Sequence, residues 1–268
     1  MGNTEADSRE QTARIDVELR PRFYSGGVRA SGGIAAASLI LIVAGLVTGL
    51  AYGREGELPV LRQLIGRSVR GRPIYVYRLG ESGGRPIVVV GCTDGDESAG
   101  IAIVTALRGL QPPAGVDLWL VPTINPDGLA ADTTGNAHGV DLNRNFSYAW
   151  RHLGGSGYLN SGPRPLSEPE SRAVHRFLRR IKPRLAIWFH QPLALVDDSQ
   201  GSHRLERSFG RLVGLPLRRL TDYPGSITNW ENHRFPRSTA FVTELPPRPL
   251  TRARAMRYAH AILELTRS

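Results

Sequence analysis

Short apolar runs alternate with amphipathic, helix-compatible stretches along most of the chain after residue 53. Four runs are short and mostly β-branched or aromatic, as buried strands are: 86–91, 116–122, 185–189 and 239–245. Helical patterns lie between or after them, at 98–110, 167–181 and 252–265. Ser167 has the side chain and the spacing to Glu170 of a helix N-cap. Strands separated by helices predict an α/β/α sandwich with a mixed, mainly parallel sheet.

A different apolar run stands near the N-terminus. Residues 30–52 carry no charge, and Arg20, Arg22 and Arg29 precede them. A run of about 23 residues is long enough to cross a bilayer as a helix. The basic residues before it favour a cytoplasmic N-terminus. We therefore predict a protein of the cell membrane with three parts: a disordered cytoplasmic tail at 1–29, one transmembrane signal anchor at 30–52, and one extracytoplasmic globular domain at 53–268.

Two other interpretations of this run stay open. Gly49 and Ala51 are small residues at the spacing of a signal-peptide cleavage site, so the run could instead be removed after export. A buried core helix is the third interpretation. The first two both place the folded domain outside the membrane.

Composition narrows the possible partners. The formal net charge is +10, yet Lys182 is the only lysine and the arginines are scattered. No basic stretch is interleaved with aromatic residues, so we expect no nucleic-acid partner. The single cysteine, Cys92, excludes an internal disulfide and a cysteine zinc cage within one chain. Its apolar neighbours indicate a buried residue near a strand end and not a nucleophile. We expect a monomer.

Acidic residues and a histidine follow the predicted strands. Asp94 and Glu97 come after the first strand, His190 follows the third, and Glu244 lies near the end of the fourth. Ligands bind at the carboxyl ends of parallel strands, and a catalytic metal needs three protein ligands. Asp94, Glu97 and His190 are therefore candidate metal ligands. Alternatively, the two carboxylates cap a helix N-terminus and His190 is an ordinary buried histidine.

Four segments occur in a characteristic order: GCTDGDE at 91–97, GVDLNRNF at 139–146, FHQP at 189–192 and TELP at 243–246. Together they resemble the zinc carboxypeptidase family, and within it the small murein peptide amidases of bacteria, which trim cell-wall peptides. The resemblance covers roughly 54–246. It implies a bound zinc ion, held by Asp94, Glu97 and His190, and a peptide or muropeptide substrate.

The resemblance also implies roles for four further residues. Glu244 stands at the position of the family's catalytic base, and its apolar neighbours would raise its affinity for protons. The alternative is that Glu244 forms a structural ion pair with an arginine. Asn143 and Arg144 match the clamp residues with which the family binds the carboxylate of the substrate. A guanidinium suits this role because it can hold a carboxylate by two parallel hydrogen bonds. Tyr223 resembles a substrate-facing tyrosine, although it could be only a turn aromatic.

Two positions depart from the family pattern. Asp94 stands where the family has its first metal-binding histidine, and Thr134 stands where it has an arginine that stabilises the oxyanion. Loss of one such donor costs about 100 to 1000-fold in rate. His138 is a candidate substitute donor. The hypotheses are thus a membrane-anchored zinc-dependent peptide hydrolase and a catalytically impaired relative that binds cell-wall peptides. Deacylation of a small amide is a third.

Overall fold

The computed structural model describes residues 60–155, 159–198, 203–220 and 223–267 of the 268. All of them belong to one compact unit, Tyr52–Ser268. In this part of the chain no helix has both the length and the apolar character needed to cross a membrane. The predicted tail at 1–29 and the predicted anchor at 30–52 lie outside the described residues.

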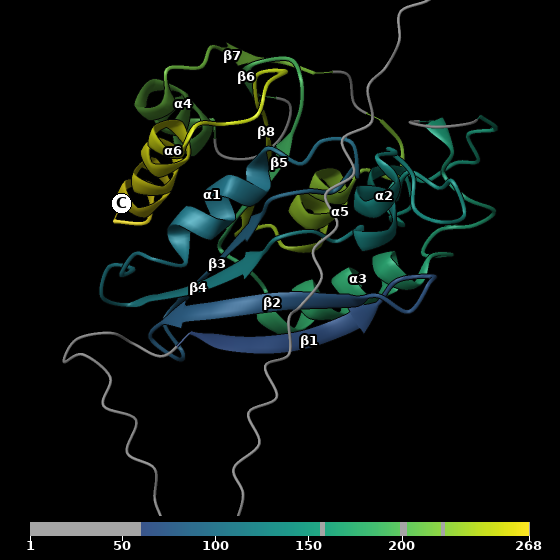
Figure 1. The fold of residues 1–268 in the computed structure, drawn as a ribbon, viewed down its shortest axis with the longest axis horizontal. Helices are drawn as coiled ribbons and strands as arrows, with labels where there is room; N and C mark the ends of the chain where they lie inside the picture. The colour runs from purple at the N-terminus through teal and green to yellow at the C-terminus, as the bar shows by residue number, and fades with distance from the viewer. Residues whose placement is uncertain (1–59, 156–158, 199–202, 221–222, 268) are drawn as a thin grey trace, which may run out of the picture. The chain divides into compact units, whose positions relative to one another are not determined.

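Eight strands of the described chain form one mixed sheet, in the order β1-β2-β4-β3-β5-β8-β6-β7. Figure 1 shows the strands between two groups of helices. Their bounds are β1 Leu61–Arg67, β2 Pro73–Gly80, β3 Arg85–Val90, β4 Val116–Val121, β5 Leu185–His190, β6 Leu195–Asp197, β7 Leu217–Arg218 and β8 Thr239–Glu244.

The middle of the sheet is parallel and its flanks are partly antiparallel. Strands β4, β3, β5 and β8 pair in parallel with one another. On one side β2 joins β4 antiparallel and β1 joins β2 antiparallel; on the other, β6 joins β8 antiparallel. The four predicted strands are confirmed to within one residue at each end. They are buried along almost their whole length, which explains their continuous apolar sequences.

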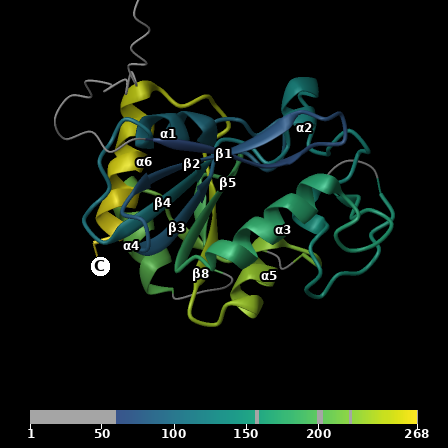
Figure 2. The ribbon, with the colours of Figure 1, turned by 90° about the horizontal axis from the view of Figure 1, so that it is seen from below.

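Helices cover both faces of the sheet, as Figure 2 shows from below. On one face lie α1 (Gly100–Leu107), α4 (Arg204–Val213) and α6 (Arg252–Leu265). On the other lie α3 (Pro169–Ile181) and α5 (Ile227–Arg234), with α2 (Pro126–Ala131) beyond the sheet end. Each face has its own buried cluster, one built around Phe209 and Ile262, the other around Phe177 and Trp230. The sandwich prediction is confirmed.

The predicted cap of α3 is wrong. The helix begins at Pro169, and its N-cap is Glu168, whose side chain makes no capping bond. The Ser167 hydroxyl instead donates to the Glu168 carboxylate at 2.7 Å and accepts from the Asn145 amide at 2.9 Å. Ser167 therefore stabilises the loop before α3. Its hydroxyl bonds Glu168 and Asn145 instead of capping the free N–H groups of the helix.

Candidate metal centre and cleft

The four suspected site residues meet at one edge of the sheet. Asp94 and Glu97 lie in the loop after β3, His190 is the last residue of β5, and Glu244 is the last residue of β8. His190 and Glu244 are paired directly across the parallel ladder. All four line one cleft of about 480 Å³.

Three side chains converge on a single point of this cleft. Asp94, Glu97 and His190 each offer a ligand atom within 4.8 Å of the others. The His190 Nδ1 atom lies 3.0 Å from an Asp94 oxygen and 2.9 Å from a Glu97 oxygen. One Asp94 oxygen is buried without any hydrogen-bond partner among the described residues. This set of one imidazole and two carboxylates fits a divalent cation of the zinc type.

The charges at this point favour a cation. Burial alone would lower the pKa of His190, but the neighbouring Asp94 and Glu97 carboxylates raise it well above its usual range. Asp141 lines the same cleft, and burial and the charge of Asp94 raise its pKa well above its ordinary value, although the charge of Arg144 opposes this. The carboxylates of Asp94 and Asp141 therefore repel each other, and a bound metal ion would offset this repulsion.

Tight backbone packing holds the loop of Asp94 and Glu97 in place. A Cβ atom added to Gly95 would lie 2.0 Å from the carbonyl carbon of Gly128, so only glycine permits this approach. The Glu97 carboxylate accepts the backbone N–H of Gln191 at 3.0 Å. The Gln191 side chain in turn accepts the N–H of Ala99 at 3.0 Å. The ligand loop and the end of β5 are thus joined directly by hydrogen bonds.

Glu244 stands beside the candidate ligands with few polar neighbours. The residue is 8% exposed, and its carboxylate has one long contact, 3.5 Å, to the backbone N–H of Leu193. Burial, with smaller contributions from the Glu97 and Asp94 charges, raises the pKa of Glu244 despite the opposing charge of His190. No arginine pairs with it among the described residues. The alternative of a structural ion pair is therefore not supported by the geometry.

Asn143, Arg144 and Tyr223 also line the cleft. The Arg144 guanidinium lies over the Tyr223 ring, 4.2 Å from its centre, and donates to the Asn143 carbonyl at 2.9 Å. Its buried Nε atom donates to no described residue and lies 3.7 Å from an Asp141 oxygen. The Asn143 side-chain carbonyl accepts the Ile227 N–H at 3.0 Å. Arg144 thus retains donors for an anionic group.

The second departure from the family pattern also lies in the cleft. The Thr134 hydroxyl donates to the Asp96 carboxylate at 2.8 Å, and Thr134 brings no positive charge to the cleft lining. His138 does not replace the missing donor, because its Nδ1 atom pairs with Glu168 at 2.7 Å and the residue is absent from the lining. The structure therefore does not support His138 as the candidate substitute donor.

The cleft residues that sequence analysis missed include Asp141, Asp197 and Asn229. Asp141 had a visible signal, since it stands two positions before Asn143 within the 139–146 segment. Its carboxylate accepts the Asn143 N–H at 2.8 Å and so shapes the clamp loop. Cys92 is buried as expected, and burial raises the pKa of its thiol to about 12, which excludes a ready thiolate.

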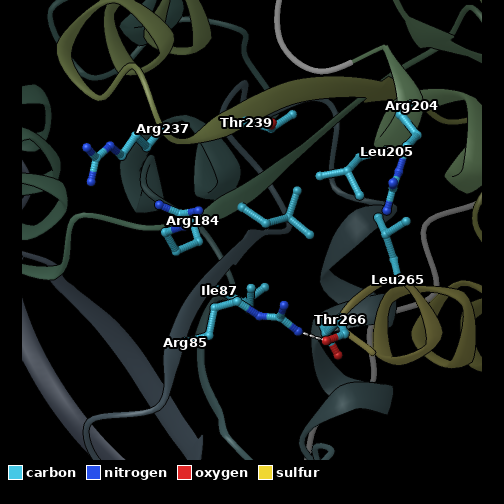
Figure 3. A pocket seen from close by; sticks show the side chains of 10 residues that line it. Arg85, Ile87, Arg184, Arg204, Leu205, Arg237, Thr239, Leu265 and Thr266 are labelled. Carbon is cyan, nitrogen blue, oxygen red and sulfur yellow. Dashed lines mark hydrogen bonds between the residues drawn. The ribbon is translucent and has the colours of Figure 1, made fainter. Parts of the chain in front are cut away.

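A second cavity, of about 260 Å³, lies at the amino ends of the same strands. Figure 3 shows Arg85, Arg184, Arg204 and Arg237 around it, with Arg85 reaching the Thr266 backbone carbonyl. Its described lining contains no carboxylate or histidine side chain. The candidate chemistry therefore belongs to the cleft at the carboxyl ends.

Comparison with known proteins agrees with this geometry. Residues 114–196 match the family model described as zinc carboxypeptidase. The murein peptide amidase A of Escherichia coli K12 is 32% identical over 191 residues, which are 66% of this chain and 78% of that protein. The enzyme of the same name from Vibrio campbellii is 34% identical over 198 residues, 68% of this chain and 78% of that protein.

A solved structure supports the same grouping. The murein-tripeptide amidase of Escherichia coli O157 superposes with a TM-score of 0.63 at 30% identity. The match covers 80% of this chain and 94% of that one. The similarity therefore extends over nearly the whole described unit and is not confined to the ligand segments.

Proposed function

Because this chain belongs to the zinc carboxypeptidase family, we propose that it is a metal-dependent hydrolase of amide bonds in murein-type peptides. The observation that carries the proposal is the convergence of Asp94, Glu97 and His190 within 4.8 Å, with Glu244 beside them in one cleft. Three protein ligands and an adjacent carboxylate are what metal-assisted hydrolysis requires.

The cleft residues have two proposed roles, metal binding and proton transfer. Asp94, Glu97 and His190 would hold one zinc ion, which supplies Lewis acidity to the reacting carbonyl when it is bound. Glu244 takes a proton from water and later returns it to the leaving amine. The burial that raises its pKa suits it to both steps.

The clamp residues indicate a substrate with a free carboxylate. Arg144 would hold that group with the donors it does not use within the protein, and Tyr223 would keep the guanidinium in place by stacking. Asn143 would add its amide. The relatives named murein peptide amidase support a cell-wall peptide as the substrate class.

A second candidate function is binding of such peptides without cleavage. Two observations favour it: Asp94 replaces the histidine ligand, and the Thr134 hydroxyl is occupied by Asp96 where the family has an arginine. Either change would weaken hydrolysis while leaving the Arg144 clamp intact. The cleft would then recognise muropeptides as a binding module.

We further propose that the domain works outside the cell membrane, anchored by residues 30–52 and acting as a monomer. The uncharged length of that run and the arginines before it support the placement. Export suits a substrate that lies in the cell wall.

The two functions are separated by measuring zinc and hydrolysis on the full chain, unaltered and as Asp94→His. The hydrolytic function predicts that the cleft holds a zinc ion, which is lost on Glu97→Gln, and that product is released from a muropeptide. A chain that binds the muropeptide but releases no product, with zinc in the cleft only after Asp94→His, would instead establish the binding function. Glu264→Gln, which alters an exposed pair with Arg267, is the matched control.

A further inference from the structure

A second cluster of metal-ligating side chains lies outside the cleft residues just described. Asp198 follows β6, His203 is the N-cap residue of α4, and Glu206 is the third residue of that helix. Each offers a ligand atom within 4.8 Å of the other two. The His203 Nδ1 atom contacts the Asp198 carboxylate directly.

Glu206 is the unusual member of this cluster. The residue is 0% exposed, and both of its carboxylate oxygens are buried without a hydrogen-bond partner among the described residues. A buried carboxylate is normally satisfied by several donors, because its desolvation is costly. Burial raises the pKa of Glu206 to about 7, and the His203 charge only partly opposes this.

No arginine of its own helix neutralises Glu206 within the described chain. The helix carries Arg204, Arg207 and Arg211, yet none of them donates a hydrogen bond to its carboxylate. Arg204 instead lines the cavity at the far end of the sheet, as Figure 3 shows. The charged groups that act on this carboxylate include His203, Asp198 and Asp197, so negative charge exceeds positive charge there, and the group that would complete this site is a cation.

We propose that Asp198, His203 and Glu206 form a second metal site, which binds one divalent transition-metal ion of the zinc class. One imidazole nitrogen with two carboxylate oxygens is a donor set that zinc accepts. Calcium and magnesium prefer more ligands, all of them oxygen. The Asp198 and His203 side chains are 32% and 57% exposed, so water can fill the remaining positions.

The site would join the end of β6, beside the cleft, to helix α4. Asp198 directly follows Asp197, which lines the catalytic cleft and whose carboxylate accepts the Leu220 N–H at 2.9 Å. His203 and Glu206 belong to the start of α4, which packs on the sheet through Phe209. A bound ion would fasten the end of β6 to this helix and so hold Asp197 in place.

The test counts metal ions on the full chain, stripped with a chelator and then titrated with Zn²⁺ alone. Calorimetry and elemental analysis should find one more equivalent on the unaltered chain than on His203→Asn or Glu206→Gln. To isolate the second site, the same titration is made in a Glu97→Gln background, where Zn²⁺ should still raise the melting temperature. In that background, adding Glu206→Gln should abolish the rise.

His138→Asn is the matched control, since His138 also pairs with a glutamate at 2.7 Å but belongs to no cluster of three ligands in the described chain. It should leave the ion count unchanged. His203 is exposed, so His203→Asn should fold even if Glu206→Gln does not. Equal zinc stoichiometry and affinity in the unaltered chain and in His203→Asn would overturn the proposal. A loss of about tenfold or more in affinity at one site supports it, since even a change in the outer-shell partners of a ligand typically costs that much.

Discussion

His190 and Glu244 stand opposite each other as the last residues of two adjacent parallel strands, β5 and β8. Their side chains share one cleft, and the charge of His190 partly offsets the burial that raises the pKa of Glu244. The sheet itself therefore fixes the spacing between a candidate ligand and the candidate base. A site built on strand ends is more precise than one built on loops.

Glu244→Gln is predicted to abolish hydrolysis while leaving zinc and peptide binding in place. Glutamine keeps the size and the contact to Leu193 but cannot accept a proton, so turnover should fall by about 100 to 10,000-fold. The measurement is kcat on a muropeptide, beside zinc content and peptide affinity. Glu264→Gln should keep unaltered values, and retained turnover in Glu244→Gln would remove this residue from the mechanism.

Thr134→Arg is predicted to raise the rate. Thr134 lies in the cleft lining without a charge, and a guanidinium there would supply the oxyanion donor that the family pattern has. One such donor is worth about 100 to 1000-fold in kcat. Thr133→Arg carries the same charge outside that lining and should not raise the rate. An equal effect of both variants would show that net charge, and not position, is responsible.

Arg144→Gln is predicted to weaken binding of peptides that end in a free carboxylate. The variant removes a charge-assisted pair of hydrogen bonds, so the dissociation constant should rise by about 10 to 100-fold. A peptide with an amidated C-terminus should bind the unaltered chain and the variant alike. Arg179→Gln, on the exposed face of α3, is the control and should discriminate between the two peptides as the unaltered chain does.

The central strands were predictable because burial on both faces gives them continuous apolar sequences. β1 and β2 were not predicted, because they lie at a partly solvated sheet edge where charged and apolar residues mix. The short helix α2 was also missed. It depends on Asn125, whose side chain accepts the Gly128 N–H, and on tertiary packing that a local pattern does not reveal.

The candidate ligands were predictable because each follows a recognisable strand. Their meeting was expected from the carboxyl ends of parallel strands, but the distance between Glu97 and His190 was not, since it depends on the pairing of β3 with β5. The orientation of the His138 side chain could not be predicted either, because its partner Glu168 lies 30 residues away in the sequence. Glu206 gave no signal at all, as an acidic residue in a charged helix resembles any solvated one until its burial is known.

Glu231 is predicted to make the fold less stable as the pH rises. The residue is fully buried on α5, one oxygen accepts the Trp188 Nε1–H at 3.1 Å, and the other has no partner among the described residues. Burial raises its pKa from 4.5 to about 8, against the opposing effect of Trp188. The folded state therefore holds the proton more tightly than the unfolded state does.

By linkage, the contribution of Glu231 is fully present below its unfolded pKa and is lost as the pH rises through about 8. A tenfold difference in proton affinity between the two states corresponds to about 1.4 kcal/mol, so the contribution is on the order of a few kcal/mol. Glu231→Gln keeps an acceptor for Trp188 and cannot ionise, so the fall in melting temperature between pH 5 and pH 8 should shrink. Glu264→Gln, which is exposed, should keep the unaltered slope. An equally steep fall in Glu231→Gln would show that other groups cause the pH dependence.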